Sequence, residues 1–166
     1  MATFQFKGLE QYTQYLQRIE ANTEEICGAA VYAMADVVTD EIRNNLEKLE
    51  TISSKEAIAA WKEKRKVPLT KVQKKALEQS LGISPMQKEN GFYNVKAGFD
   101  GYNTTKTKKY PNGQPNAMIA RSVDSGSSFR QKNPFVRTAV KTAQKKAIGT
   151  AKIVVDTKIH ALKNNK

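Results

Sequence analysis

The sequence contains one cysteine and one histidine, and these two shortages exclude several kinds of chemistry. Cys27 alone cannot form a disulfide within the chain. A zinc centre needs four ligands, and Cys27 with His160 supplies only two without recruiting carboxylates. A serine nucleophile needs a positioned base, and no pattern brings His160 to a serine. We therefore expect no catalytic residue, no cofactor and no metal, and we predict that the chain is not an enzyme.

Long apolar runs and phosphate-binding glycine motifs are also missing. The longest apolar run, GAAVYAMA, is far shorter than the roughly 20 residues that span a bilayer. Neither the P-loop pattern nor the Gly-x-Gly-x-x-Gly pattern occurs. The opening MATFQFKGLEQY lacks the basic-then-apolar order of a signal peptide. We expect synthesis in the cytoplasm and no contact with a membrane.

Positive charge is abundant and unevenly distributed along the chain. The net charge is +12 over 166 residues. Residues 1–50 contain four Lys/Arg against nine Asp/Glu, whereas residues 51–166 contain 24 against seven. This segregation from −5 to +17 fits a head-to-tail contact between copies, or simply two solvated faces of a monomer. The length and the ordinary 39% hydrophobic content predict one domain over residues 1–166.

Apolar residues at helical spacing predict three principal helices. The first starts at Leu9, and the second runs from Ile26 to Leu49 as a long N-terminal helix. Asn22 with Glu25 resembles a capping box between them. Asn133-Pro134 fits an N-cap followed by an N1 proline, which predicts a last helix of nearly thirty residues.

Residues 53–82 are predicted to form a basic helical hairpin inserted between these helices. Capping boxes at Ser53 and Thr70 predict the two helix starts. Pro68 prevents the first helix from continuing, and Gly82 is predicted as the glycine that follows the second.

The spacing then changes to the alternation typical of strands. FYNVKAGF is predicted as one half-buried strand and AMIARSV as another. Residues 100–116 between them read as a long flexible loop rich in turn signals. The order of elements predicts an α+β fold, in which the long C-terminal helix packs on a small antiparallel sheet.

The stretch ARSVDSGSSFRQKNPFVRTAV allows three interpretations: a phosphate cradle, a serine site, or a junction between a strand and a helix. We favour the junction, or a subunit interface there, because the motifs for the other two are incomplete. Asp124 is expected to accept hydrogen bonds from the backbone or from Ser127 and Ser128, and Phe135 to anchor the helix in the core. For Arg121 and Arg137 three alternatives remain: an ion pair with Asp124, an ion pair with a neighbouring subunit, or exposure to solvent.

Nucleic-acid binding is an alternative hypothesis based on the charge. Lysines of the loop and of the last helix could contact DNA or a protein partner, namely Lys106, Lys108, Lys109, Lys141 and Lys145. Exposed aromatic residues could provide stacking faces. The basic residues are scattered over several predicted elements, which makes this hypothesis weaker than an assembly role.

Three segments of the chain resemble the gene-product-ten-like family of tailed bacteriophages. FQFKGLEQYTQYLQRI resembles the family's opening strand and Gly-Leu helix start, and LGISPMQKENGFYNVKAGFDGY its central strands. YPNGQPNAMIARSVDSGSSFRQKNPFVRTAV resembles its most recognisable part, a strand running into acid-x-Gly-Ser/Thr and a Pro-Phe-x-Arg helix start. Asp124 and Ser127 replace the family's usual glutamate and threonine, and Thr138 stands where a second proline is common.

The resemblance implies an α+β virion protein without catalytic activity. It implies a place in the neck or tail, in head–tail joining or tail completion. It also implies assembly as a ring, a hexamer or dodecamer, that contacts head-completion or tail proteins. A basic lumen in such a ring could also contact the DNA that passes through the neck. Tailed-phage proteins of this kind are made in the cytoplasm of the bacterial host.

Overall fold

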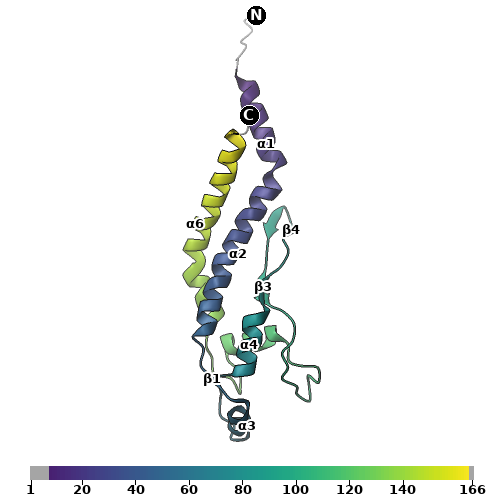
Figure 1. The fold of residues 1–166 in the computed structure, drawn as a ribbon, viewed down its shortest axis with the longest axis vertical. Helices are drawn as coiled ribbons and strands as arrows, with labels where there is room; N and C mark the ends of the chain where they lie inside the picture. The colour runs from purple at the N-terminus through teal and green to yellow at the C-terminus, as the bar shows by residue number, and fades with distance from the viewer. Residues whose placement is uncertain (1–7, 165–166) are drawn as a thin grey trace, which may run out of the picture.

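The computed structural model describes residues 8–164 as an elongated molecule built on two long helices (Figure 1). Helix α2 (Thr23–Glu47) and helix α6 (Phe135–Asn164) pack along each other. Helix α1 (Leu9–Ala21) continues the line of α2 beyond the end of α6. The short helices gather at the opposite end of the molecule. This mixed α+β architecture confirms the predicted fold class, although the C-terminal helix packs chiefly on α2 and not on an antiparallel sheet as predicted.

The predicted helix starts are correct at Leu9, Asn22, Ser53 and Thr70, and at the last two the predicted caps are present. The Ser53 Oγ accepts the Glu56 N–H, and the Glu56 carboxylate accepts the Ser53 N–H, at the start of α3 (Ser54–Lys62). The same box at Thr70 opens α4 (Lys71–Ser80). At Asn22 a new helix does begin, but the predicted box is wrong, because the Asn22 side chain donates to the Arg18 carbonyl and closes α1.

The strands are shorter and more numerous than predicted. β1 (Thr51–Ile52) pairs in parallel with β2 (Leu69–Thr70). β3 (Leu81–Ile83) pairs antiparallel with β6 (Ala97–Phe99), and β4 (Gln87–Glu89) pairs antiparallel with β5 (Phe92–Asn94). The single strand predicted over FYNVKAGF is therefore wrong, because its two halves join different ladders. Gly82 was predicted as the glycine that ends α4 in a left-handed conformation. It lies in strand β3 instead, so this prediction is also wrong.

The segment AMIARSV is a helix and not the predicted strand. Helix α5 (Asn116–Ser125) buries Ile119, Ala120 and Val123 on one side. A short apolar run fits a buried strand and a buried helix equally well, so its periodicity does not decide between them. The resemblance to the phage family also implied a strand at this place, and helix α5 stands there instead.

The hydrophobic core lies at the end of the molecule where the short elements gather. Its buried members come from α2 and the residues just after it, β2, α4, α5 and the start of α6: Ile42, Leu46, Leu49, Leu69, Leu77, Ile119, Ala120, Val123, Phe135 and Ala139. Strands β3, β5 and β6 pack on α2, and α6 reaches the β3–β6 ladder where the rings of Phe135 and Phe99 lie 6.0 Å apart.

Candidate assembly surfaces

Asp124 caps the start of α6 from the neighbouring helix α5. Its carboxylate is mostly buried, and Oδ1 accepts the N–H groups of Val136 at 2.9 Å and Arg137 at 3.1 Å. These donors lack partners within a helix because they belong to its first turn. The predicted backbone hydrogen bonds to Asp124 are therefore present. The predicted N-cap at Asn133 is wrong, since Asp124 is the side chain that accepts these bonds.

Arg137, in the first turn of α6, also connects α6 to α5 through Asp124. Its Nε lies 2.6 Å from Asp124 Oδ2, and its Nη2 donates to the Asp124 carbonyl at 2.8 Å. Arg137 thus satisfies a carbonyl at the end of α5 and pairs with the carboxylate that caps α6. Arg121 is exposed and is not among the described partners of Asp124. Phe135 is 2% exposed, which confirms it as a core anchor.

The serines of this segment do not have the surroundings of a nucleophile. The Ser127 Oγ is buried and has no hydrogen-bond partner among the described residues, so the predicted bond to Asp124 is absent. His160 lies on α6, 25 positions after Phe135, which corresponds to about 37 Å along the helix axis. The one histidine of the chain is therefore far from the serines. The junction joins two helices rather than a strand and a helix.

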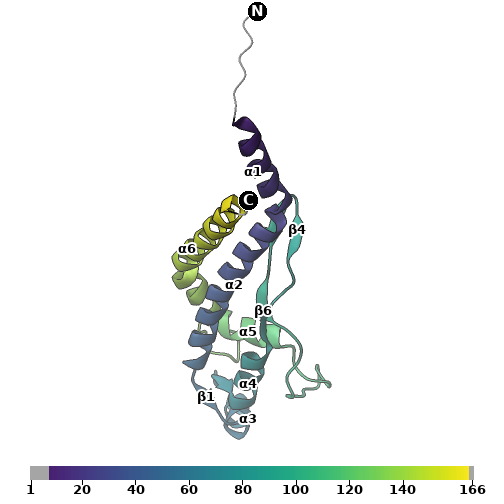
Figure 2. The ribbon, with the colours of Figure 1, turned by 45° about the horizontal axis from the view of Figure 1, so that its top comes forward.

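The two groups of candidate DNA-contacting lysines lie on different sides of the molecule. Lys141 and Lys145 are on α6, whereas Lys106, Lys108 and Lys109 are on the loop of residues 100–116. Figures 1 and 2 show this loop projecting away from the body on the side opposite α6. The structure thus does not bring these lysines into one continuous surface.

The base of that loop is closed by backbone hydrogen bonds. The Asn103 N–H donates to the Gln114 carbonyl, beside an antiparallel bridge between Tyr102 and Pro115. Gly113 has a φ of 114°, and a Cβ at this position would lie 2.0 Å from the Asn103 carbonyl oxygen. Only glycine fits this closure. The flexibility of the loop beyond its base stays a prediction.

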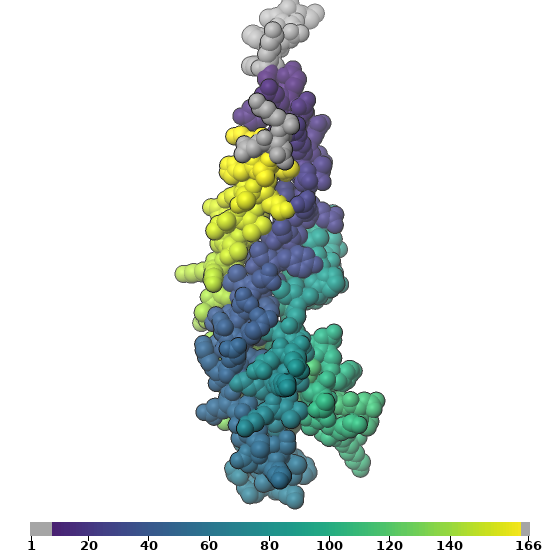
Figure 3. Space-filling view, viewed as in Figure 1, coloured from purple at the N-terminus to yellow at the C-terminus, as the bar shows by residue number. Residues whose placement is uncertain are grey.

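Two exposed stripes of opposite charge run along the two long helices. On α2 the acidic stripe consists of Asp36, Asp40 and Glu47, and on α6 the basic stripe consists of Lys141, Lys145 and Lys152. Members of each stripe are separated by four, seven or eleven residues, spacings that return to the same side of a helix. Within α2, Arg43 pairs with Asp40 at 2.7 Å. The described ion pair between the two helices, Lys158 with Glu25, lies outside both stripes. Both helices reach the surface over most of their length (Figure 3).

Helix α1 carries an apolar stripe that nothing in the described chain covers. Leu9, Tyr12 and Leu16 are 58%, 70% and 61% exposed. No residue of α1 is buried. The helical spacing of these residues was predicted from the sequence, but such spacing normally indicates a covered face. The sequence alone gave no sign that this stripe lies at the free end of the molecule.

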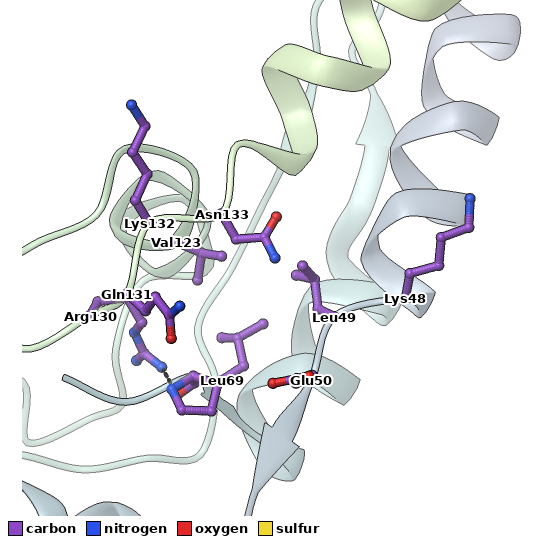
Figure 4. Close-up of a pocket in the computed structure, with 10 residues that line it drawn as sticks. Lys48, Leu49, Glu50, Leu69, Val123, Arg130, Gln131, Lys132 and Asn133 are labelled. Atoms are coloured by element: carbon purple, nitrogen blue, oxygen red, sulfur yellow. Dashed lines mark hydrogen bonds between the residues drawn. The ribbon is translucent and has the colours of Figure 1, made fainter.

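A cavity of about 300 Å³ opens where the end of α2, β2 and the segment after α5 meet (Figure 4). Arg130 lines it and is only 4% exposed. Its Nη1 donates to the Pro68 carbonyl and its Nη2 to Gln73 Oε1 at 3.0 Å. Burial lowers the pKa of Arg130 because the charged form loses its hydration. The sequence analysis missed Arg130, since arginine is rarely buried and no local pattern marks it.

Within residues 8–164, no group of three or more His, Cys, Asp or Glu side chains gathers where it could hold a metal ion. No helix in this range is long and apolar enough to span a bilayer.

Comparison with known proteins gives no further assignment. Protein-family models, curated proteins and solved structures were each searched, and none matches the chain.

Proposed function

We propose that this chain is a structural protein of a tailed-phage virion, placed in the neck or tail, that assembles into a ring. Head–tail joining and tail completion are the roles that fit. The observation that carries this proposal is that exposed acidic residues run along α2 and exposed basic residues run along α6. The sequence resemblance to the phage family supports the location in the virion.

Separated stripes suit a contact in which the same two surfaces of every copy are used. The acidic stripe of one copy meets the basic stripe of the next, and the contact repeats until the ring closes. A contact of this kind is heterologous, because it joins different surfaces of the two copies. Complementary charge sets the partner and the register more than it sets the affinity. Apolar contacts must therefore add to the attraction.

The elongated shape and the apolar stripe of α1 also support assembly. A side chain such as Tyr12, at 70% exposed, buries little apolar surface in a monomer and so contributes little to its stability. Aromatic and aliphatic side chains clustered on a surface are typical of protein contacts. Partners in the virion, such as head-completion or tail proteins, provide surfaces that such a helix end could meet.

Charge reversal tests the proposal directly. One variant carries Lys141→Glu and Lys145→Glu, and a second carries Asp36→Lys and Asp40→Lys. We expect each variant alone to lose self-association in sedimentation velocity, because the two reversed charges of one stripe then have the same sign as the other stripe. Mixing the two variants should restore association, since acidic surfaces again face basic ones. A control with Lys106→Glu and Lys108→Glu on the loop should behave like the unmodified chain.

Two results would contradict the proposal. If both charge-reversed variants associate as the unmodified chain does, the stripes are not the contact. If the unmodified chain is a monomer at every concentration and salt, self-assembly of the isolated chain does not occur.

Binding to nucleic acid is the second candidate, favoured by the net charge of +12. It predicts a monomer or dimer whose affinity for a short DNA duplex falls steeply with salt. Fluorescence anisotropy with a labelled duplex between about 50 and 200 mM salt measures this slope. In that case Lys141→Glu with Lys145→Glu weakens DNA binding, whereas Asp36→Lys with Asp40→Lys strengthens it. The assembly proposal predicts loss of association for both.

A further inference from the structure

The cavity beside Arg130 combines an apolar floor with a positively charged wall. Leu49, Leu69 and Val123 line it and are buried. Arg130 and Gln131 lie on the side that faces Leu49 and Glu50 across the opening (Figure 4). The volume of about 300 Å³ is enough for a side chain or a small molecule, but not for a helix or a DNA duplex.

Arg130 is a buried cation whose described partners are all uncharged. Its hydrogen bonds go to a backbone carbonyl and to the amide oxygen of Gln73. Its Nε–H has no acceptor among the described residues. A buried charge is normally paired, because removing it from water is costly unless an opposite charge compensates. Arg130 therefore lacks the anion that its surroundings would favour.

We propose that this cavity binds a carboxylate carried on a short aliphatic stem, such as a glutamate side chain or a small dicarboxylic acid. The carboxylate lies toward Arg130 and accepts the Nε–H, since Nη1 and Nη2 already donate to Pro68 and Gln73. The methylene groups of the stem cover Leu49, Leu69 and Val123. This inference does not depend on the virion role and holds for a monomer as well as for a ring.

The apolar floor distinguishes a carboxylate on a stem from a phosphate. An inorganic phosphate has no apolar part, so it would leave the three buried side chains uncovered and would lose part of its own hydration against them. The phosphates of a duplex cannot enter, because the cavity is too small for the sugar and base that accompany them. The ligand is thus expected to have one charged end and one apolar part.

The charged residues at the rim make opposite contributions. Lys48 and Lys132 extend away from the opening, so they act as nearby charges rather than as contacts (Figure 4). Glu50 also lines the cavity and repels an entering anion. Removing Glu50's charge should therefore strengthen binding, whereas removing the two lysine charges should weaken it.

The test uses the full chain labelled with ¹⁵N and titrated with succinate. We expect saturable chemical-shift changes at Leu49, Leu69 and the Arg130 Nε–H, with millimolar affinity, as is usual for small ligands with few contacts. Succinamide, which has the same shape without charge, and sodium chloride at equal ionic strength serve as controls. A blocked Ala-Glu-Ala tripeptide tests the other source of the carboxylate, with Ala-Gln-Ala as its control. Binding of succinate alone identifies a small acid as the ligand, and binding of the peptide identifies an acidic side chain.

Variants at the rim keep the test independent of folding. Glu50→Gln should tighten succinate binding about two- to fivefold, and Lys48→Ala with Lys132→Ala should weaken it by a similar factor, as expected for exposed charges. Arg130→Gln should abolish binding, and its spectrum shows whether the fold survives. Absence of saturable shifts, equal shifts with succinamide, or weaker binding in Glu50→Gln would overturn the proposal.

Discussion

The two ends of this molecule are built in different ways. At the end formed by α3, α4 and α5, leucine, isoleucine and phenylalanine side chains from five elements form one core. At the other end α1 buries nothing, and most buried residues in the first half of α2 and along α6 are small, such as Ala30 and Ala147. The first end thus has a hydrophobic core of its own. The second is a narrow two-helix rod with several large apolar side chains exposed to solvent. Exposed apolar side chains of this kind are expected on a surface that binds a partner.

The largest loss of stability is expected when a buried side chain at the core end is shortened. Phe135→Ala should lower the free energy of unfolding by about 3–5 kcal/mol, because it leaves a cavity among buried side chains. Urea denaturation followed by circular dichroism measures the change. Phe92→Ala is the matched control, since Phe92 is 77% exposed and should change stability by less than about 0.5 kcal/mol. An equal loss in both variants would show that Phe135 does not anchor the core.

Loss of the cap at the α5–α6 junction should have the next largest effect. Asp124→Ala removes the acceptor for two N–H groups of α6 and the partner of Arg137. We expect a loss of about 2 kcal/mol, combining a helix cap with a charge-assisted hydrogen bond. Asp36→Ala on the exposed stripe is the control and should be nearly neutral. The same urea experiment measures both variants, and a neutral Asp124→Ala would contradict the capping role.

The closure of the loop at residues 100–116 predicts a loss of about 1–3 kcal/mol for Gly113→Ala. The new methyl group would meet the Asn103 carbonyl oxygen, and the positive φ is strained for alanine. Gly101→Ala separates these two causes, because its φ of 66° is also positive but nothing lies within 4 Å of the added Cβ. Thermal unfolding should therefore show a smaller shift for Gly101→Ala. Equal shifts would mean that backbone strain alone is responsible.

The smallest effect on stability is expected at the rod end. Leu16→Ser should leave the free energy of unfolding within about 0.5 kcal/mol, because Leu16 is 61% exposed. It should nevertheless weaken association in sedimentation velocity if α1 contacts a partner copy. Gln14→Ser, on the same helix but off the apolar stripe, is the control. A large loss of stability in Leu16→Ser would contradict the view of α1 as an uncovered helix.

Local sequence patterns predicted what depends on local contacts. The boxes at Ser53 and Thr70 need residues only three positions apart, and both are present. The pairing of Asp124 with Arg137 was one of the predicted options. That Asp124 pairs with Arg137 and not with Arg121 depends on how α5 packs against α6. The helical state of AMIARSV and the burial of Arg130 depend on packing between distant segments, which no short pattern contains. The exposure of α1 likewise depends on where α6 ends.

The central claim is that opposite charges on α2 and α6 drive self-assembly, and salt tests it most directly. Size-exclusion chromatography with light scattering at about 150 and 500 mM salt changes the screening length from roughly 8 to 4 Å. We predict a discrete ring-sized oligomer at the lower salt that dissociates at the higher salt. A monomer at both salts, or an oligomer equally stable at both, would contradict the claim.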